Sequence, residues 1–373
     1  MRGALLIPIL AAFAFGGCTR AEIVSRDGGG ARMDAAPGDG GASDAALDAG
    51  LPDAGPDTDA GCGYEEVDTR GEPPGCTLRR PPGRPACESG RPAGGDFVFA
   101  VHTLDIEVDV DVGFDQDGFC TDSISGPAQC QPDPMAPGHP VDRPEGIDNA
   151  FGTNFASNLS AVYFSGLMAD LNTDINAAMA AGFGNVTVQL RGWNGQPDDQ
   201  NVELVFVNTV CGTPSGSPAM CGIVPRPTPL DWTLEDNVFY PRTDAFLGGD
   251  PMNPIVVDPG AYVSNNQLVA RLPDAAVLNL VTPNGTIELS LRDAVLVSSV
   301  SADGGGLVDG FISGKWPRIS VEAAARALDV RADDDGGSGV PCDAMSLTIG
   351  FTARRATWGA LMTGPGPTDR CPP

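Results

Sequence analysis

Positive charge is scarce in this chain. The 373 residues hold 22 Lys and Arg against 49 Asp and Glu, so the formal net charge is −27, and Lys315 is the only lysine. The first 61 residues carry nine acidic and four basic side chains, which leaves 40 acidic and 18 basic ones in the remainder. Surfaces that bind nucleic acid or anionic lipid need an excess of positive charge. We therefore expect no nucleic-acid partner and no membrane contact through a charged face.

Residues and motifs of common catalytic sites are also scarce. The chain has two histidines, His102 and His139, and contains no GxSxG, HExxH or P-loop sequence. A Ser-His-Asp triad would need one of these histidines, and no local pattern selects its serine. We therefore expect a non-catalytic protein. The alternative is a secreted carbohydrate-active hydrolase that uses paired carboxylates, which this chain has in excess.

The apolar run at the start of the chain is too short to cross a bilayer, which takes about 20 residues. It extends from Ala4 to Phe15, follows the positive charge of Arg2, and ends with Gly16 and Gly17 before Cys18. A charged start, a short apolar core and small residues at a cleavage site are typical of a secretory signal peptide. Residues 1–17 are thus expected to direct export.

Cys18 directly after the small residues resembles the lipobox of bacterial lipoproteins. The resemblance implies cleavage before Cys18, lipidation of this residue and a membrane partner through the lipid anchor. By the sorting rule of such proteins, Thr19 implies the outer membrane or cell surface. The chain also resembles uncharacterised surface lipoproteins of high-GC Gram-negative bacteria in three segments, Gly113–Gly118, Gly146–Asn149 and Pro341–Ser346. This resemblance implies no activity.

Bulky apolar residues are nearly absent between Cys18 and residue 61. This stretch is composed mainly of Ala, Asp, Gly and Pro and has no aromatic residue. Such a composition buries too little apolar surface to offset the entropy of ordering, so it predicts a disordered linker with a reach of roughly 35–40 Å. The expected organisation is a signal peptide at 1–17, a lipidated cysteine and linker at 18–61, an irregular Cys/Pro-rich segment at 62–95, and a globular domain at 96–373.

Ten cysteines in an exported chain indicate disulfide bonds. Setting Cys18 aside leaves an odd nine: Cys62, Cys76, Cys87, Cys120, Cys130, Cys211, Cys221, Cys342 and Cys371. The equal ten-residue offsets predict the local pairs Cys120–Cys130 and Cys211–Cys221, and Cys342 could pair with Cys371 near the C-terminus. No cysteine or histidine cluster has the spacing of a structural zinc site.

Strand patterns dominate the globular part. From Leu104 to Val112 apolar and acidic residues alternate strictly, which is the signature of a half-buried strand. Further strands are predicted at 186–190, 202–210, 267–272, 276–281, 286–291, 294–300 and 343–354. An apolar stripe predicts one long helix at 159–181, and Ser320 caps a short one to Leu328. Many short strands with Gly/Pro turns favour an antiparallel β-sandwich or jelly-roll-like domain.

An acidic loop follows the alternating strand. The sequence Asp115-Gln-Asp117-Gly resembles the beginning of many calcium loops, in which Gly allows a sharp turn that lets carboxylates converge. Asp148 and Asn149 form a second polar cluster that could supply further oxygen ligands. We therefore predict one structural Ca²⁺ at these four residues. The competing interpretation of the carboxylates on the preceding strand is a solvated face that blocks edge-to-edge pairing.

A stapled β domain on a linker suits display of a binding or structural module. A carbohydrate or protein ligand is expected at its loops, because loops on a rigid scaffold carry most binding residues. Trp193, beside Asn194-Gly195 at a strand end, is the candidate for stacking against a sugar. No sequence pattern selects one ligand or one oligomeric state.

Overall fold

The computed structural model describes residues 22–23, 76–86, 96–106, 111–121, 130, 141–152, 167–214, 237–274, 276–282, 285–317 and 342–363. These residues are mainly β-strand, as predicted. The strands are β1 (Glu22–Ile23), β2 (Phe97–Ile106), β3 (Val186–Arg191), β4 (Asp199–Pro214), β5 (Asn237–Pro241), β6 (Val257–Ser264), β7 (Gln267–Arg271), β8 (Val277–Thr282), β9 (Gly285–Ser290), β10 (Arg292–Val300), β11 (Gly306–Pro317), β12 (Ala344–Trp358) and β13 (Met362–Thr363). The helices are η1 (Pro144–Gly146), α2 (Leu167–Ala180), η4 (Thr243–Ala245) and η5 (Leu247–Gly249). Within the described ranges no helix has the length and apolar character needed to span a membrane.

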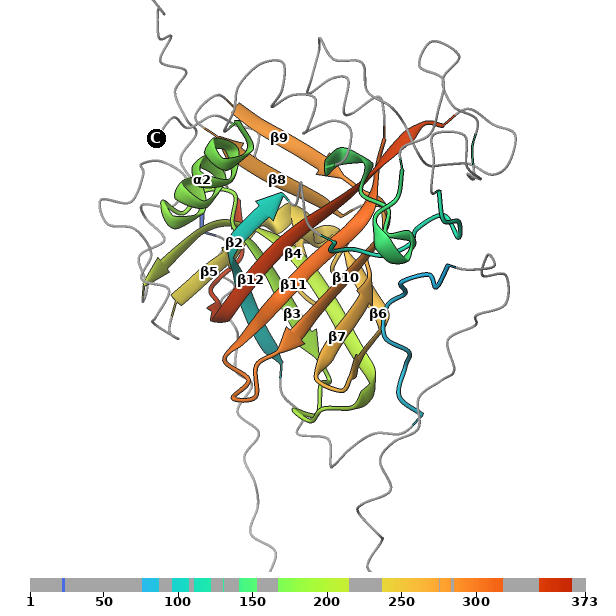
Figure 1. Cartoon of the computed structure of the whole chain (residues 1–373). Helices are drawn as coiled ribbons and strands as arrows, with labels where there is room; N and C mark the ends of the chain where they lie inside the picture. The colour runs from blue at the N-terminus through green and yellow to red at the C-terminus, as the bar shows by residue number, and fades with distance from the viewer. Residues whose placement is uncertain are drawn as a thin grey trace, which may run out of the picture.

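Eight strands form one antiparallel sheet that closes on itself (Figure 1). Their order is β11-β10-β7-β6-β4-β3-β2-β12, and β12 pairs again with β11 from Pro317↔Ala344 to Gly306↔Arg354. The antiparallel, mainly β character is therefore confirmed, whereas the single closed sheet differs from the predicted sandwich or jelly roll. The alternation along each strand shows that one face is buried. It does not show whether that face meets a second sheet or the interior of its own sheet.

The interior of the closed sheet is filled by apolar side chains. Phe99, Leu190, Leu204, Leu268 and Leu296 are fully buried there and belong to one continuous core. At one end of the sheet this core continues into α2 and the β8–β9 hairpin, which Figure 1 shows above the strand ends. The interior is thus a packed core.

The helix α2 supplies the end of this core. Ile175 and Met179 are buried in it, and Leu171 packs against it, so the four-residue apolar spacing is confirmed over 171–179. The helix closes at Gly182, whose φ of +93° is the left-handed conformation that favours glycine. The predicted residues 159–166 of this helix and the predicted short helix at 320–328 lie outside the described residues.

Two asparagines of α2 bind the backbone of β2. Asn176 accepts a hydrogen bond from the Leu104 N–H at 2.8 Å and donates one to its carbonyl at 2.9 Å. Asn172 accepts from the Ile106 N–H at 3.0 Å and also donates to the carboxylate of Asp105. Leu104 and Ile106 are buried while Asp105 is exposed, as the alternation predicts. Of the other acidic residues on this predicted strand, Glu107 and Asp109 lie outside the described residues.

The described part of the Cys/Pro-rich segment, residues 76–86, packs on the outer face of the sheet. Tyr262 of β6 donates a hydrogen bond to the Pro82 carbonyl at 2.5 Å. Arg84 donates to the carbonyls of Gln200 and Gly260 at 3.1 and 2.5 Å, and its guanidinium lies 5.0 Å from the centre of the Tyr262 ring. The segment is irregular, as expected, and forms part of the same folded body as the sheet. Within the predicted linker, Glu22–Ile23 pair with Met362–Thr363.

The disulfide pairing differs from the prediction. Cys120 bonds to Cys76, and Cys130 bonds to Cys342, so the expected pairs Cys120–Cys130 and Cys342–Cys371 are wrong. Equal spacing suggested two loop staples, but spacing along the chain does not report which loops meet in space. The loop after β2 lies against the Cys/Pro-rich segment, and residue 130 reaches the start of β12. Cys211 lies in β4, whereas Cys221 and Cys371 are outside the described residues.

Candidate functional site

The loop 111–121 that follows β2 is held on the outside of the sheet by backbone and apolar contacts. Phe114 is buried against Val269 and Val297, and its ring lies 5.0 Å from that of Phe311. The Asp115 N–H donates to the Arg79 carbonyl at 2.9 Å. The Cys76–Cys120 disulfide joins the far end of the loop to the same segment. The loop is therefore anchored at both ends.

Within this loop the carboxylates shape the turn. The Oδ1 of Asp115 accepts a hydrogen bond from the Gly118 N–H, and the Oδ1 of Asp117 accepts one from the Phe119 N–H, both at 2.7 Å. Gly118 has a φ of +83°, a conformation that a residue with a side chain rarely adopts. The Asp-x-Asp-Gly pattern thus forms the sharp turn that the sequence predicts.

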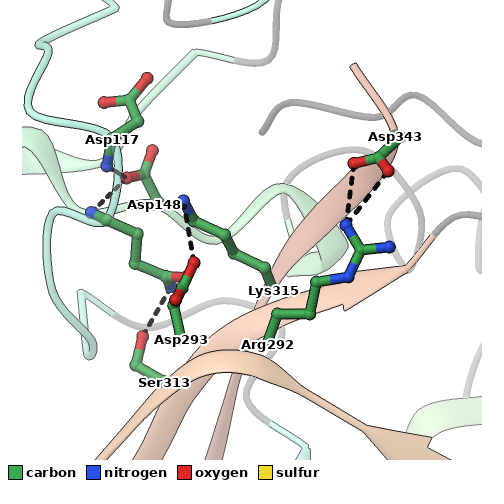
Figure 2. Close-up of polar contacts among 8 residues, drawn as sticks. Asp117, Asp148, Arg292, Asp293, Ser313, Lys315 and Asp343 are labelled. Carbon is green, nitrogen blue, oxygen red and sulfur yellow. Dashed lines mark hydrogen bonds and ion pairs between the residues drawn. The ribbon is translucent and has the colours of Figure 1, made fainter. Parts of the chain in front are cut away.

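Asp148 joins this turn from a separate segment. It follows η1 and the buried Ile147, and its own N–H donates to the Phe114 carbonyl at 3.1 Å. The side chain is buried, with 5% exposure, and its Oδ2 accepts the N–H groups of Gln116 at 2.6 Å and Asp117 at 3.2 Å. Figure 2 shows the carboxylate directed at this part of the loop.

Asp115, Asp117 and Asp148 together form a carboxylate cluster. One oxygen of each lies within 4.8 Å of the others, so the cluster could hold a metal ion. The sequence predicts these three residues as ligands, and the fold brings them together. The fourth predicted ligand, Asn149, is buried beside them, and its Oδ1 accepts the Gly152 N–H at 3.2 Å.

The electrostatics of the cluster favour a cation or a proton. Burial raises the pKa of Asp115 to about 6, and the negative charge of Asp117 acts in the same direction. The Gly118 N–H and the Arg80 guanidinium act in the opposite direction but are outweighed. Nearby, the buried Lys315 lies 3.7 Å from the carboxylate of Asp293 (Figure 2). Carboxylates that lie close together with little solvent repel one another, and a bound cation or proton lowers the free energy of the cluster by neutralising part of this charge.

A pocket of about 660 Å³ adjoins the cluster. It lies between residues 80–84, the start of the acidic loop and the outer faces of β6, β7, β10 and β11. Asp115 and Gln116 belong to both the loop and the pocket wall. The pocket was not predicted, because its walls come from six separate stretches of the chain and no local pattern marks them.

Trp193 does not offer the stacking surface expected of it. It is 4% exposed, packs edge-on against Phe97 with ring centres 4.8 Å apart, and donates its Nε1–H to the Gln196 carbonyl at 3.1 Å. The strand β3 ends at Arg191, and Gly192 follows with a φ of +76°, so the alternation of β3 does not extend to Trp193, whose ring belongs to the core. Among the other tryptophans, Trp316 is buried, Trp358 is half-buried and Trp232 is outside the described residues.

The histidines show no catalytic arrangement within the described residues. The Nδ1 of His102 lies 2.8 Å from the Thr352 hydroxyl on the neighbouring strand. Burial, assisted by Arg354, lowers the pKa of His102. His139 lies outside the described residues. Comparison with protein-family models, with curated proteins and with solved structures gave no match for this chain.

Proposed function

We propose that this chain is a non-catalytic, lipid-anchored surface lipoprotein whose closed sheet is a binding or structural module stabilised by one Ca²⁺. The observation that supports it best is the convergence of Asp115, Asp117 and Asp148 from two separate segments. The signal sequence ending at Cys18 supports export and anchoring, and the acidic linker supports display away from the membrane.

The spacing of the carboxylates suits calcium. Ca²⁺ binds oxygen ligands at about 2.3–2.6 Å, so two ligands on opposite sides of one ion lie roughly 4.6–5.2 Å apart. The three oxygens here lie within 4.8 Å of one another, close enough to share one ion. Backbone carbonyls, Asn149 and water would complete the six to eight ligands that calcium takes. The ion would join the acidic loop to the segment of Asp148.

The competing hydrolase function finds less support. Asp115, Asp258 and Asp293 all line the pocket, as paired catalytic carboxylates would. However, the two oxygens of Asp258 accept the N–H groups of Gly260 at 2.9 Å and Arg271 at 2.6 Å. Asp293 lies beside Lys315. Because these interactions already use the carboxylates structurally, we favour binding over catalysis.

Calcium is expected to raise the melting temperature of residues 62–373 by about 5 °C at pH 7.5, since a ligand at 100 times its Kd adds about 2.7 kcal/mol. The gain should shrink as the pH falls through 6. Because the pKa of Asp115 is raised to about 6 in the folded protein, a proton competes with the ion below that pH. Without calcium the sign reverses: ionising Asp115 opposes folding, so this residue adds stability as the pH falls from 7 toward 5.

Differential scanning calorimetry with calcium or chelator at both pH values measures this effect. Asp274→Asn is the matched control, because it removes an exposed carboxylate outside the cluster and should keep the full calcium response. An unchanged melting temperature on chelation at pH 7.5, together with no bound calcium by elemental analysis, would rule out the ion.

Cys18→Ser is expected to move the protein from the membrane fraction to the soluble fraction, because the lipidated thiol is lost. Cell fractionation followed by immunoblotting measures the distribution. Thr19→Ser, which keeps the cysteine, should leave the protein in the membrane fraction. Retention of the Cys18→Ser protein in that fraction would refute the lipid anchor.

A further inference from the structure

The pocket on the outer face of the sheet has the size and composition of a small-molecule site. Its volume of about 660 Å³ lies within the range of roughly 300–1,000 Å³ typical of such sites. Phe114, Tyr262, Val269 and Val295 give it an apolar surface. Charged groups of both signs complete the wall. The chemical class of the ligand therefore depends on which of these charged groups have no partner within the protein.

The carboxylates of the pocket are already engaged. Asp258 accepts two backbone N–H groups, and Asp293 lies beside Lys315. Asp115 accepts the Gly118 N–H. Arg84 is engaged as well, since it donates to two backbone carbonyls and stacks on Tyr262. Each of these groups therefore already has a hydrogen-bond or ion-pair partner within the protein.

Two arginines of the pocket, Arg80 and Arg271, remain available to a ligand. Arg80 is half-buried in the pocket wall, and its Nε is buried with no hydrogen-bond partner among the described residues. Among the described residues, neither guanidinium donates a hydrogen bond, although Arg80 interacts electrostatically with Asp115. Arg271 is exposed at the same pocket. A guanidinium carries five N–H donors, which match the two oxygens of a carboxylate.

We propose that this pocket binds a small organic carboxylate with an adjoining apolar or aromatic group. Arg80 donates to the carboxylate, Arg271 adds positive charge at the opening, and Phe114 and Tyr262 contact the apolar group. The proposal rests on the binding function proposed above and names its ligand class. The same chemistry occurs at the C-terminus of a peptide and in free aromatic acids.

Isothermal titration calorimetry on residues 62–373 in calcium-containing buffer tests this assignment. The probes are N-acetylphenylalanine for a peptide C-terminus, phenylacetate for a free acid, N-acetylphenylalaninamide as the neutral analogue, and glucuronate as an acid without an apolar group. We expect N-acetylphenylalanine to bind with a Kd of about 1 mM, as its size allows. The amide and glucuronate should bind at least about tenfold more weakly. The ratio of the Kd values of N-acetylphenylalanine and phenylacetate shows whether the pocket prefers a peptide C-terminus or a free aromatic acid.

Arg80→Gln should weaken binding of N-acetylphenylalanine about tenfold or more, because a charge-assisted contact is lost. It should keep the melting temperature, since this guanidinium donates no hydrogen bond to any of the residues that the structure describes. Arg354→Gln, an exposed arginine of β12 away from the pocket, is the matched control and should bind normally.

Equal affinity for acid and amide, equal affinity for glucuronate, unchanged binding by Arg80→Gln, or no detectable binding would each overturn the ligand class. The calcium response and the membrane fractionation are measured separately. Failure here is therefore distinguishable from failure of the proposed function.

Discussion

Replacing both Cys130 and Cys342 with serine is expected to lower the free energy of unfolding by about 4–5 kcal/mol. The two cysteines are 212 residues apart, so their bond restricts a very large loop of the unfolded chain. Both are buried with 5% exposure, and Cys342 lies directly before β12, the strand that closes the sheet. Urea unfolding followed by circular dichroism measures the loss.

The other described disulfide is the matched control for this effect. Cys76 and Cys120 are 44 residues apart, so the same entropic argument gives a loss smaller by about 1 kcal/mol for the double serine variant. A Cys130/Cys342 variant within about 1 kcal/mol of the parent protein would contradict the argument, since it would mean that this bond constrains little of the unfolded chain.

Asp148→Ala is expected to cost about 3–4 kcal/mol in chelator and to abolish stabilisation by calcium. The variant removes the acceptor of the Gln116 and Asp117 N–H groups, which are partly buried, and a donor left without a partner costs about 1–3 kcal/mol when buried. It also removes one of the three clustered carboxylates. Thermal unfolding with calcium and with chelator measures both effects.

Asp148→Asn separates the two roles of this residue. The amide oxygen can still accept the two N–H groups, so most of the stability in chelator should remain, whereas the charge that attracts calcium is lost. A normal calcium response in Asp148→Asn would show that the negative charge of Asp148 does not contribute to calcium binding. Full stability of Asp148→Ala in chelator would show that the two hydrogen bonds contribute little.

Much of the strand content could be predicted from local alternation. The pattern of β3, β7 and β10 marks one face of each strand as buried, and their predicted positions agree with the structure within a few residues. Two strands of the closed sheet, β6 and β11, were missed because Pro259, Gly260, Gly310 and Gly314 suggest turns. In β11 these glycines allow close packing: a Cβ at Gly310 would lie 2.6 Å from the Phe351 ring, and one at Gly314 would lie 3.0 Å from the Cβ of Ala294.

The candidate site likewise has a part that local sequence predicts and a part that depends on tertiary packing. The Asp115–Gly118 turn is local, because its hydrogen bonds join residues two or three positions apart. Asp148 was predicted from its polar surroundings alone, and its contact with the turn depends on the packing of Phe114 and Ile147. Arg80 carried no signal, since the pocket around it is formed by the acidic loop together with strands more than 170 residues further along the chain.

The sequence by itself determined the acidic balance of the folded part, the mainly β character and the sharp Asp115–Gly118 turn. Each of these follows from composition or from interactions between residues close in the chain. The export signal ending at Cys18 stays a prediction from the sequence. Only the tertiary structure decided that the sheet closes through β11 and β12, that Cys130 bonds to Cys342, and that Arg80 lines a pocket. These outcomes depend on contacts between distant segments. Their free energies arise from the joint packing of the whole core, which no local pattern contains.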